Sequence, residues 1–190
     1  TDWSKQILLN NNIKIPIIVC PLGVDRNIFK PESKDEDGPY IFFHVGKWEK
    51  RKSQDILLQC FEQAFNMNDN VELWLCPHNP FLNENELRYW TNMVKYNKLS
   101  SKIKVFSRFD TQQELSSVIN NADCGVFISR AEGWNNEILE SMSLNKPCIV
   151  TNYSAHTHYC NNENSFLIDI ENTELANDDK WFFGQGSWAK

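Results

Sequence analysis

The sequence predicts an α/β fold in which a parallel sheet carries helices on both faces. Short, almost continuous apolar runs recur along the chain, as expected of strands that are covered on both sides. Between these runs, apolar residues recur at every third or fourth position, which is the spacing of amphipathic helices. Strands that alternate with helices favour a parallel sheet joined by right-handed crossovers.

Length and charge narrow the class of protein. The chain has 190 residues, of which 41% are hydrophobic and 23% charged, and this fits one globular domain with a sizeable core. Its net charge of −6 disfavours nucleic acids and anionic membranes as partners. No apolar run approaches the length of a membrane span, and no basic stretch with an apolar core opens the chain as in a secretion signal.

The six cysteines form no C-x-x-C pair. Most lie in or at the end of apolar runs, where cysteine acts as a small hydrophobic residue. Free thiols in a reducing compartment therefore explain them better than a disulfide framework, and we expect the cytoplasm as the location. These residues are Cys20, Cys60, Cys76, Cys124, Cys148 and Cys160.

The N-terminal part of the chain predicts little regular structure. Residues 1–12 predict a short helix, and the apolar residues 17–20 predict a strand. A loop punctuated by proline and glycine follows over residues 21–31. The charged, turn-rich residues 32–39 predict a mobile surface loop.

A basic turn follows the apolar strand predicted for residues 40–46. Ser53 is placed to cap the next helix, which carries an apolar stripe from Ile56 to Phe65. Cations directly before a helix N-terminus are disfavoured by the helix dipole, so their concentration in an acidic chain indicates a bound anion. A solvated charged loop remains the alternative. The basic residues are Lys47, Lys50, Arg51 and Lys52.

The middle of the chain repeats the alternation of strand and helix. Residues 71–76 predict a strand, residues 83–97 a helix and residues 103–106 another strand. A loop at residues 107–109 ends that strand. The pattern Thr-Gln-Gln-Glu at residues 111–114 is a capping box that begins the next helix.

The following strand, residues 124–128, leads through a turn into an amphipathic helix. Asn135 or Asn136 is a natural N-cap for this helix. A strand that passes through a turn of small residues into a helix directs free N–H groups and the positive dipole end at one point. Such a point favours an anion, typically a phosphate.

Two glutamates flank this turn. With Asn136 as the cap, Glu140 lies roughly 6 Å along the helix axis, beyond the anion point. Glu132 precedes the turn on the other side. Hydrogen-bond acceptors on both sides of an anion point suit a phosphate flanked by polyols, as in a nucleotide sugar. Two solvated surface residues are the alternative.

The C-terminal part of the chain predicts two more strands, at residues 147–151 and 165–170, with a polar loop between them. A metal site is an alternative for this loop, because His156, His158 and Cys160 would share one side of an extended segment. His44, inside the predicted strand 40–46, is expected to be a hydrogen-bonded core histidine.

Three of the predicted features share one place in such a fold. The basic turn after Gly46, the loop at residues 107–109 and the turn at Glu132 all follow strands. Ligands of parallel sheets bind beyond the carboxyl ends of the strands, so we expect the three to converge on one crevice.

Three motifs resemble a known family. They are residues 21–25 (Pro-Leu-Gly-Val-Asp) with 29–31 (Phe-Lys-Pro), residues 45–52 (Val-Gly-Lys-Trp-Glu-Lys-Arg-Lys), and the pair Glu132 and Glu140. Over residues 1–168 the chain resembles the C-terminal, donor-binding half of a retaining GT-B glycosyltransferase of group 1, close to the glycogen-synthase and sucrose-synthase-like group. The resemblance implies a Rossmann-like domain over residues 1–170, and an N-terminal acceptor domain that this chain lacks. Residues 171–190 lie outside the resemblance and form a tail that is first acidic and then aromatic. We expect this tail to dock on this domain or on a missing one.

The resemblance also implies roles for single residues. Lys52 matches the lysine that contacts the donor diphosphate, and Glu132 the glutamate that contacts the donor sugar; we expect these two to be catalytic. Glu140 matches the glutamate that binds the ribose. The full donor-binding set is Gly46, Lys47, Arg108, Phe109, Gly133, Trp134, Asn135, Asn136 and Glu140, with Arg108 and Phe109 against the nucleobase and residues 133–136 around the diphosphate.

Two positions depart from the family pattern. Lys47 stands where arginine is usual, which keeps the charge but loses the bidentate fork. Asn135 stands where the turn usually has its second glycine, so a side chain narrows the donor space. A non-catalytic nucleotide-binding or assembly module with a degenerate site is therefore the alternative.

The implied reaction moves a hexose from a UDP- or GDP-linked donor to an acceptor, with retention of anomeric configuration. The family uses no tightly bound metal or other cofactor, and lysine and arginine neutralise the leaving diphosphate. We expect this chain to bind the nucleotide weakly and not to catalyse transfer alone.

Overall fold

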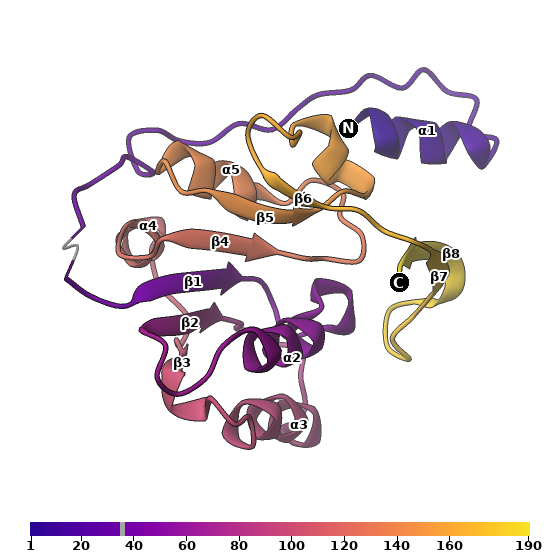
Figure 1. The fold of residues 1–190 in the computed structure, drawn as a ribbon. Helices are drawn as coiled ribbons and strands as arrows, with labels where there is room; N and C mark the ends of the chain where they lie inside the picture. Colours follow the sequence, from indigo (N-terminus) through magenta and orange to yellow (C-terminus); the bar gives the residue numbers. More distant parts are fainter. Residues whose placement is uncertain (35–36) are drawn as a thin grey trace.

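The computed structural model describes residues 1–34 and 37–190, and its centre is a six-stranded parallel sheet of order β3-β2-β1-β4-β5-β6 (Figure 1). The central strand β1 pairs with β2 on one side and with β4 on the other. The predicted fold class is confirmed. The strands are β1 Tyr40–Val45, β2 Val71–Cys76, β3 Ile103–Val105, β4 Cys124–Phe127, β5 Cys148–Thr151 and β6 Phe166–Ile168.

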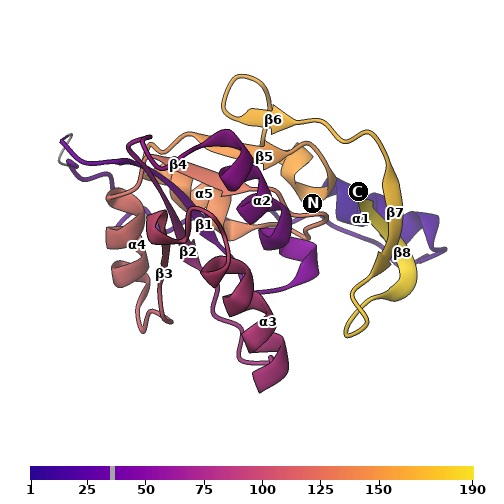
Figure 2. The same ribbon diagram turned by 60° about the horizontal axis from the view of Figure 1, so that its bottom comes forward.

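Helices cover the sheet from both sides, and two apolar clusters hold them there (Figure 2). One cluster joins the sheet to α4 and α5 through Ile119 and Ile138. The other joins it to α2 and α3 through Phe61 and Trp90. Side chains alternate between the faces of a strand, so one strand can feed both clusters. The helices are α1 Asp2–Asn10, α2 Gln54–Ala64, α3 Glu84–Lys95, α4 Gln112–Asn120 and α5 Asn136–Ser143, with 3-10 helices η1 Lys50–Lys52, η2 Ser100–Lys102 and η3 Ser154–His158.

The helix starts follow the predicted N-cap positions. The capping box that begins at Thr111 is present. Ser53 is the residue before α2, but its φ is 58° and its side chain makes no capping hydrogen bond. Ser53 thus holds the predicted N-cap position, but its left-handed backbone differs from the extended conformation in which a side chain usually caps a helix.

The predicted strand at residues 17–20 is also wrong. These residues have no strand assignment, and Ile18 is 89% exposed. Pro16 and Pro21 flank the run and have no N–H group to give to a ladder, so a short apolar run between them crosses the surface unpaired. The predicted loop at residues 32–39 has neither helix nor strand in its described part, and residues 35 and 36 lie outside the described residues.

The acidic and aromatic tail docks on this domain. It forms an antiparallel hairpin of β7 Thr173–Asn177 and β8 Phe183–Ala189, which stands beyond the arrowheads of the central strands (Figure 1). The N–H group of Ala189 donates to the carbonyl oxygen of Arg130 at 2.9 Å. Trp188 is 1% exposed, so it belongs to the core.

Two further expectations concern the chain as a whole. All six cysteines are free, as predicted. Of the four in or at the end of apolar runs, Cys76, Cys124 and Cys148 are buried but Cys20 is exposed, and Cys160 of the polar loop is buried as well. Within the described residues, no helix has the length and apolar character needed to cross a bilayer.

Candidate functional site

The turn after β1 is held closely against the sheet by the side chain of Gln54. Its Nε2 donates to the carbonyl oxygens of Gly46 at 2.8 Å and of Lys47 at 2.7 Å. A Cβ atom on Gly46 would lie 3.1 Å from both His44 Nε2 and Lys52 Cδ. The glycine therefore lets the lysine stem pass directly over the end of the strand.

Lys52 meets Glu132 across this turn. The Lys52 Nζ lies 2.7 Å from Glu132 Oε1, and Arg51 pairs with the other carboxylate oxygen. Arg51 also donates to the carbonyl oxygen of Ala131 at 2.8 Å. Two of the three features expected to converge, the basic turn and the turn after β4, are thus in direct contact.

The pair is buried and strongly coupled. Lys52 is 5% exposed, and the side chain of Glu132 is 8% exposed. Burial alone would raise the pKa of Glu132, but the charges of Lys52 and then of Arg51 outweigh it and hold the pKa at about 2. Glu132 is consequently a carboxylate at neutral pH, and it pairs with both cations.

The turn after Glu132 leads into α5 as predicted, with Asn135 rather than Asn136 in the cap position. Asn135 has φ 76° and makes no capping hydrogen bond with its side chain. Gly133 is open, since a Cβ atom there would meet nothing within 4 Å. The free N–H groups at the start of α5 therefore lie one short turn from Glu132 and its partner Lys52.

The segment around η3 holds this turn in place. The N–H group of Glu132 donates to Ser154 Oγ at 2.8 Å. The hydroxyl of Tyr159 lies 2.6 Å from the carbonyl oxygen of Trp134 and 3.0 Å from that of Asn135. Sequence analysis missed this role, because a polar segment between strands carries no periodic signal.

The metal alternative for this segment has no geometric support. The residues form the 3-10 helix η3, so His156 and His158 do not share one side of an extended segment. His158 Nδ1 lies 3.1 Å from a carboxylate oxygen of Asp2. Throughout residues 1–34 and 37–190, no group of three or more histidine, cysteine, aspartate or glutamate side chains could hold a metal ion.

His44 is the core residue that its position predicts. It is fully buried, and its Nδ1 lies 2.7 Å from the carbonyl oxygen of Val126. Burial lowers its pKa to about 4, so the ring is neutral and Nδ1 carries the proton that the carbonyl accepts. Its Nε2, the atom nearest to Gly46 and Lys52, meets no protein partner.

Glu140 is the fifth of the eight residues of α5 and is only partly buried. Burial, and then the charge of Glu137, raise its pKa to about 7. At neutral pH this carboxyl group is therefore balanced between its protonated and charged forms, unlike Glu132.

Glu140→Gln should stabilise the protein at pH 8 and change it much less at pH 5. The folded pKa lies above the ordinary value of 4.5, so the wild-type protein loses stability as pH rises from 4.5 to about 7, and glutamine has no such loss. After allowance for solvent around the exposed part, we expect a gain of about 1 kcal/mol. Urea unfolding at both pH values measures it, with exposed Glu163→Gln as control. An equal gain at pH 5 and pH 8 would contradict the assignment.

The third predicted feature lines a cavity of about 250 Å³ beside the basic turn. Arg108 and Phe109 form part of its wall, together with Val45 and Cys76 at the ends of β1 and β2. Val45 directly precedes Gly46, so this cavity adjoins the turn that carries Lys52. All three features thus lie along one edge of the sheet.

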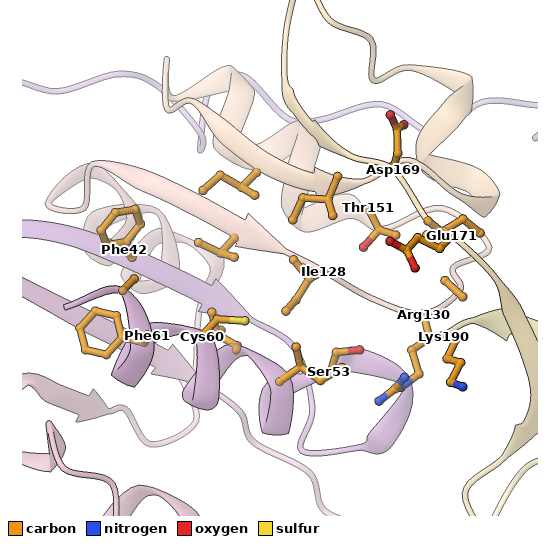
Figure 3. Close-up of a pocket in the computed structure, with 18 of the residues that line it drawn as sticks. Phe42, Ser53, Cys60, Phe61, Ile128, Arg130, Thr151, Asp169, Glu171 and Lys190 are labelled. Carbon is orange, nitrogen blue, oxygen red and sulfur yellow. The ribbon is translucent and has the colours of Figure 1, made fainter.

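A larger hollow of about 710 Å³ lies elsewhere, between α2 and the chain that follows β6 (Figure 3). Phe42, Phe61 and Ile128 give it an apolar floor, and Arg130 and Glu171 lie at its other end. Neither Lys52 nor Glu132 lines it. Judged by volume alone, this hollow would be the candidate ligand site. The basic turn that suits an anion, however, lies at the carboxyl edge of the sheet.

The comparisons with known proteins agree with this architecture. The family model "Glycosyl transferases group 1" matches residues 39–178. An uncharacterized glycosyltransferase of Methanocaldococcus jannaschii is 28% identical over 126 residues, which make up 66% of this chain and 27% of that protein. The chain thus spans about a quarter of this curated relative's length.

Solved structures share the fold. Sucrose-phosphate synthase from Thermosynechococcus elongatus has a TM-score of 0.77 at 18% identity, covering 90% of this chain and 44% of that one. Alr3699/HepE from Anabaena, in complex with UDP-glucose, has a TM-score of 0.64 at 17% identity, covering 77% and 42%. At such identities the likeness shows the fold alone, but the family model spans most of the sequence, and the chain belongs to the group 1 glycosyltransferases.

Proposed function

We propose that the chain is the donor-binding half of a retaining glycosyltransferase, which transfers a hexose from a nucleotide-diphosphate sugar to an acceptor. One observation carries the proposal. The Lys52 ammonium lies 2.7 Å from Glu132, the residue that opens the turn into α5. A cation and the free amides of a helix start therefore flank one point at the carboxyl edge of the sheet, as a diphosphate requires.

The proposed chemistry is electrostatic. Negative charge develops on the diphosphate as the bond to the sugar breaks, and Lys52, Lys47 and the amides before α5 stabilise it without a metal ion. Glu132 contacts the sugar and Glu140 the ribose. The cavity beside Arg108 and Phe109 takes the base.

The coupled pair predicts weak binding. Glu132 pairs with both Lys52 and Arg51, and a diphosphate must compete with this carboxylate for them. Part of the attraction between the diphosphate and Lys52 is offset by the free energy needed to separate Lys52 from Glu132. This supports our expectation that the chain alone binds nucleotide weakly.

The relatives guide the choice of probes. The Anabaena protein was solved with UDP and with UDP-glucose, so UDP is the first ligand to test and GDP the second. An acceptor domain in a longer parent protein would complete the active site. The free thiols suit a reducing compartment, and we keep the cytoplasm as the proposed location.

Titration calorimetry with UDP and GDP tests the proposal. We expect millimolar affinity for one of them, and a loss of about tenfold in Lys52→Ala, since one charge-assisted contact is worth roughly 1.4 kcal/mol. Lys98→Ala is the matched control, because its side chain is 84% exposed. No binding of either nucleotide at millimolar concentration would contradict the proposal.

The degenerate module remains the second candidate, because Lys52 is 5% exposed and already neutralised. Glu140→Ala and Lys52→Ala in the longer parent protein separate the two. Unchanged transferase activity in both variants would remove the assigned site, and a loss in both would remove the alternative.

A further inference from the structure

The strands β5 and β6 are well covered on only one of their two faces. On β5, Cys148 and Val150 are fully buried in the apolar cluster that includes α4 and α5. Ile149, between them, points to the opposite face and is only half-buried. On β6, Ile168 is 44% exposed. Both isoleucines line the hollow of about 710 Å³, so open space lies where a parallel sheet normally carries a helix (Figure 3).

The helix α2 forms the opposite wall of this hollow with a second apolar row. It already packs on the sheet through Leu57 and Phe61. Ile56, Cys60 and Ala64 line the hollow at intervals of four residues, and the last two of them are exposed. Rows of this spacing are the ridges with which one helix packs against another. The row on α2 therefore has the geometry of a helix contact without a helix against it.

The apolar floor of the hollow restricts the kind of segment that fits there. Phe42, Ile128 and Ile149 offer no hydrogen-bond partners. A strand needs the edge of a sheet to pair its backbone, and the hollow presents a face. An α-helix pairs its backbone groups internally. The segment that fits is thus an amphipathic helix, with apolar residues at every third or fourth position on its inner side.

A second copy of the chain is a poor source for this helix. In a two-fold pair the same surface of each copy meets the other, and a hollow cannot fill a hollow. The net charge of −6 also opposes self-association. Related proteins, in contrast, contain more chain. The matched region makes up 27% of the Methanocaldococcus jannaschii protein and 44% of the sucrose-phosphate synthase chain.

We propose that the hollow is the docking site of an amphipathic helix that the longer parent protein supplies from outside residues 1–190. The helix lies between the apolar row of α2 and the strands β5 and β6, and it completes the cover of the sheet. The inference goes beyond the proposed function, since neither Lys52 nor Glu132 lines the hollow.

Cys60 gives a direct measure of whether the hollow is filled. Its thiol is free and exposed in the 190-residue chain, and it lines the hollow (Figure 3). Alkylation with N-ethylmaleimide, followed by mass spectrometry of the peptide that contains Cys60, gives the rate of modification. We expect this rate to be at least about tenfold lower in the longer parent protein than in the 190-residue chain, because the thiol then reacts only when the helix opens.

Ala64→Glu places a carboxylate in the proposed contact. In the parent protein it should lower the melting temperature and raise the Cys60 rate toward that of the 190-residue chain, because an unpaired charge would be buried. In the 190-residue chain, where Ala64 is exposed, the melting temperature should hardly change. Gln63→Glu is the matched control, since it adds the same charge to the same turn of α2 but does not line the hollow.

Two results would overturn the inference. One is an equal Cys60 rate in the 190-residue chain and in the parent protein, which would show that no segment of the parent covers the hollow. The other is protection of Cys60 in the 190-residue chain that increases with its concentration, which would assign the hollow to a second copy. Neither measurement uses a nucleotide, so this inference and the proposed function can fail separately.

Discussion

Glu132→Gln is expected to lower the free energy of unfolding by about 3 kcal/mol at pH 7. The variant keeps the shape of the side chain but removes the only charge that the structure pairs with Lys52 among the described residues. Lys52 is 5% exposed, so its ammonium would stay buried without a counter-charge. Arg51 keeps its contact with Glu49, so the loss falls chiefly on the lysine.

The loss should depend on pH in a defined direction. The pKa of Glu132 is depressed in the folded protein to about 2 from its ordinary value of 4.5, so its stabilisation is present above pH 4.5 and is lost as pH falls toward 2. Urea unfolding at pH 7, 5 and 4 should show a gap between wild type and variant that is constant at first and narrows below 4.5. Exposed Glu32→Gln is the control. A gap under about 0.5 kcal/mol at pH 7 would contradict the buried pair.

The sheet could be predicted because the hydrophobic pattern that specifies each strand or helix lies within that segment of the sequence. The run at residues 40–46 and the stripe of α2 are apolar in a pattern that only a covered strand and a half-buried helix satisfy. The site followed from the fold. The carboxyl ends of β1 and β4 are neighbours in the sheet, so the turns that carry Lys52 and Glu132 had to approach each other.

Side-chain pairing could not be predicted in the same way. Whether the Lys52 side chain points to solvent or to Glu132 depends on the shape of the turn after β1, which Gln54 and Gly46 determine. It also depends on how close the turn after β4 comes to that lysine. The hold of η3 on residues 132–135 depends on contacts across about twenty residues of sequence, which leave no periodic trace. The wrong prediction of a strand at residues 17–20 has the opposite cause. The local apolar pattern is present there, but these residues have no partner strand in the described structure.

The hairpin could be recognised only as an aromatic tail, since its two tryptophans have opposite roles that depend on contacts outside the tail. Trp188 is 1% exposed and donates through Nε1 to Glu174 at 2.9 Å. Lys50 Nζ lies 5.7 Å and Arg130 Cζ 5.9 Å from its ring, within the range of cation–π contacts. Trp181 is 54% exposed and touches Phe81 at the edge.

Trp188→Ala is expected to destabilise the protein by about 3–5 kcal/mol, as for other buried aromatic residues, and Trp181→Ala by less than about 1 kcal/mol. Urea unfolding of both variants measures the difference, and equal losses would show that the hairpin is not docked.

The Trp188→Ala change should also affect the candidate site. Arg130 lies within cation–π range of Trp188, and its backbone N–H group donates to the carbonyl oxygen of Arg51 at 2.7 Å, so Trp188 supports the turn that carries Lys52. If the hairpin supports this turn, the folded Trp188→Ala variant should bind UDP more weakly than the wild type. If the hairpin does not support the turn, its UDP affinity should be unchanged.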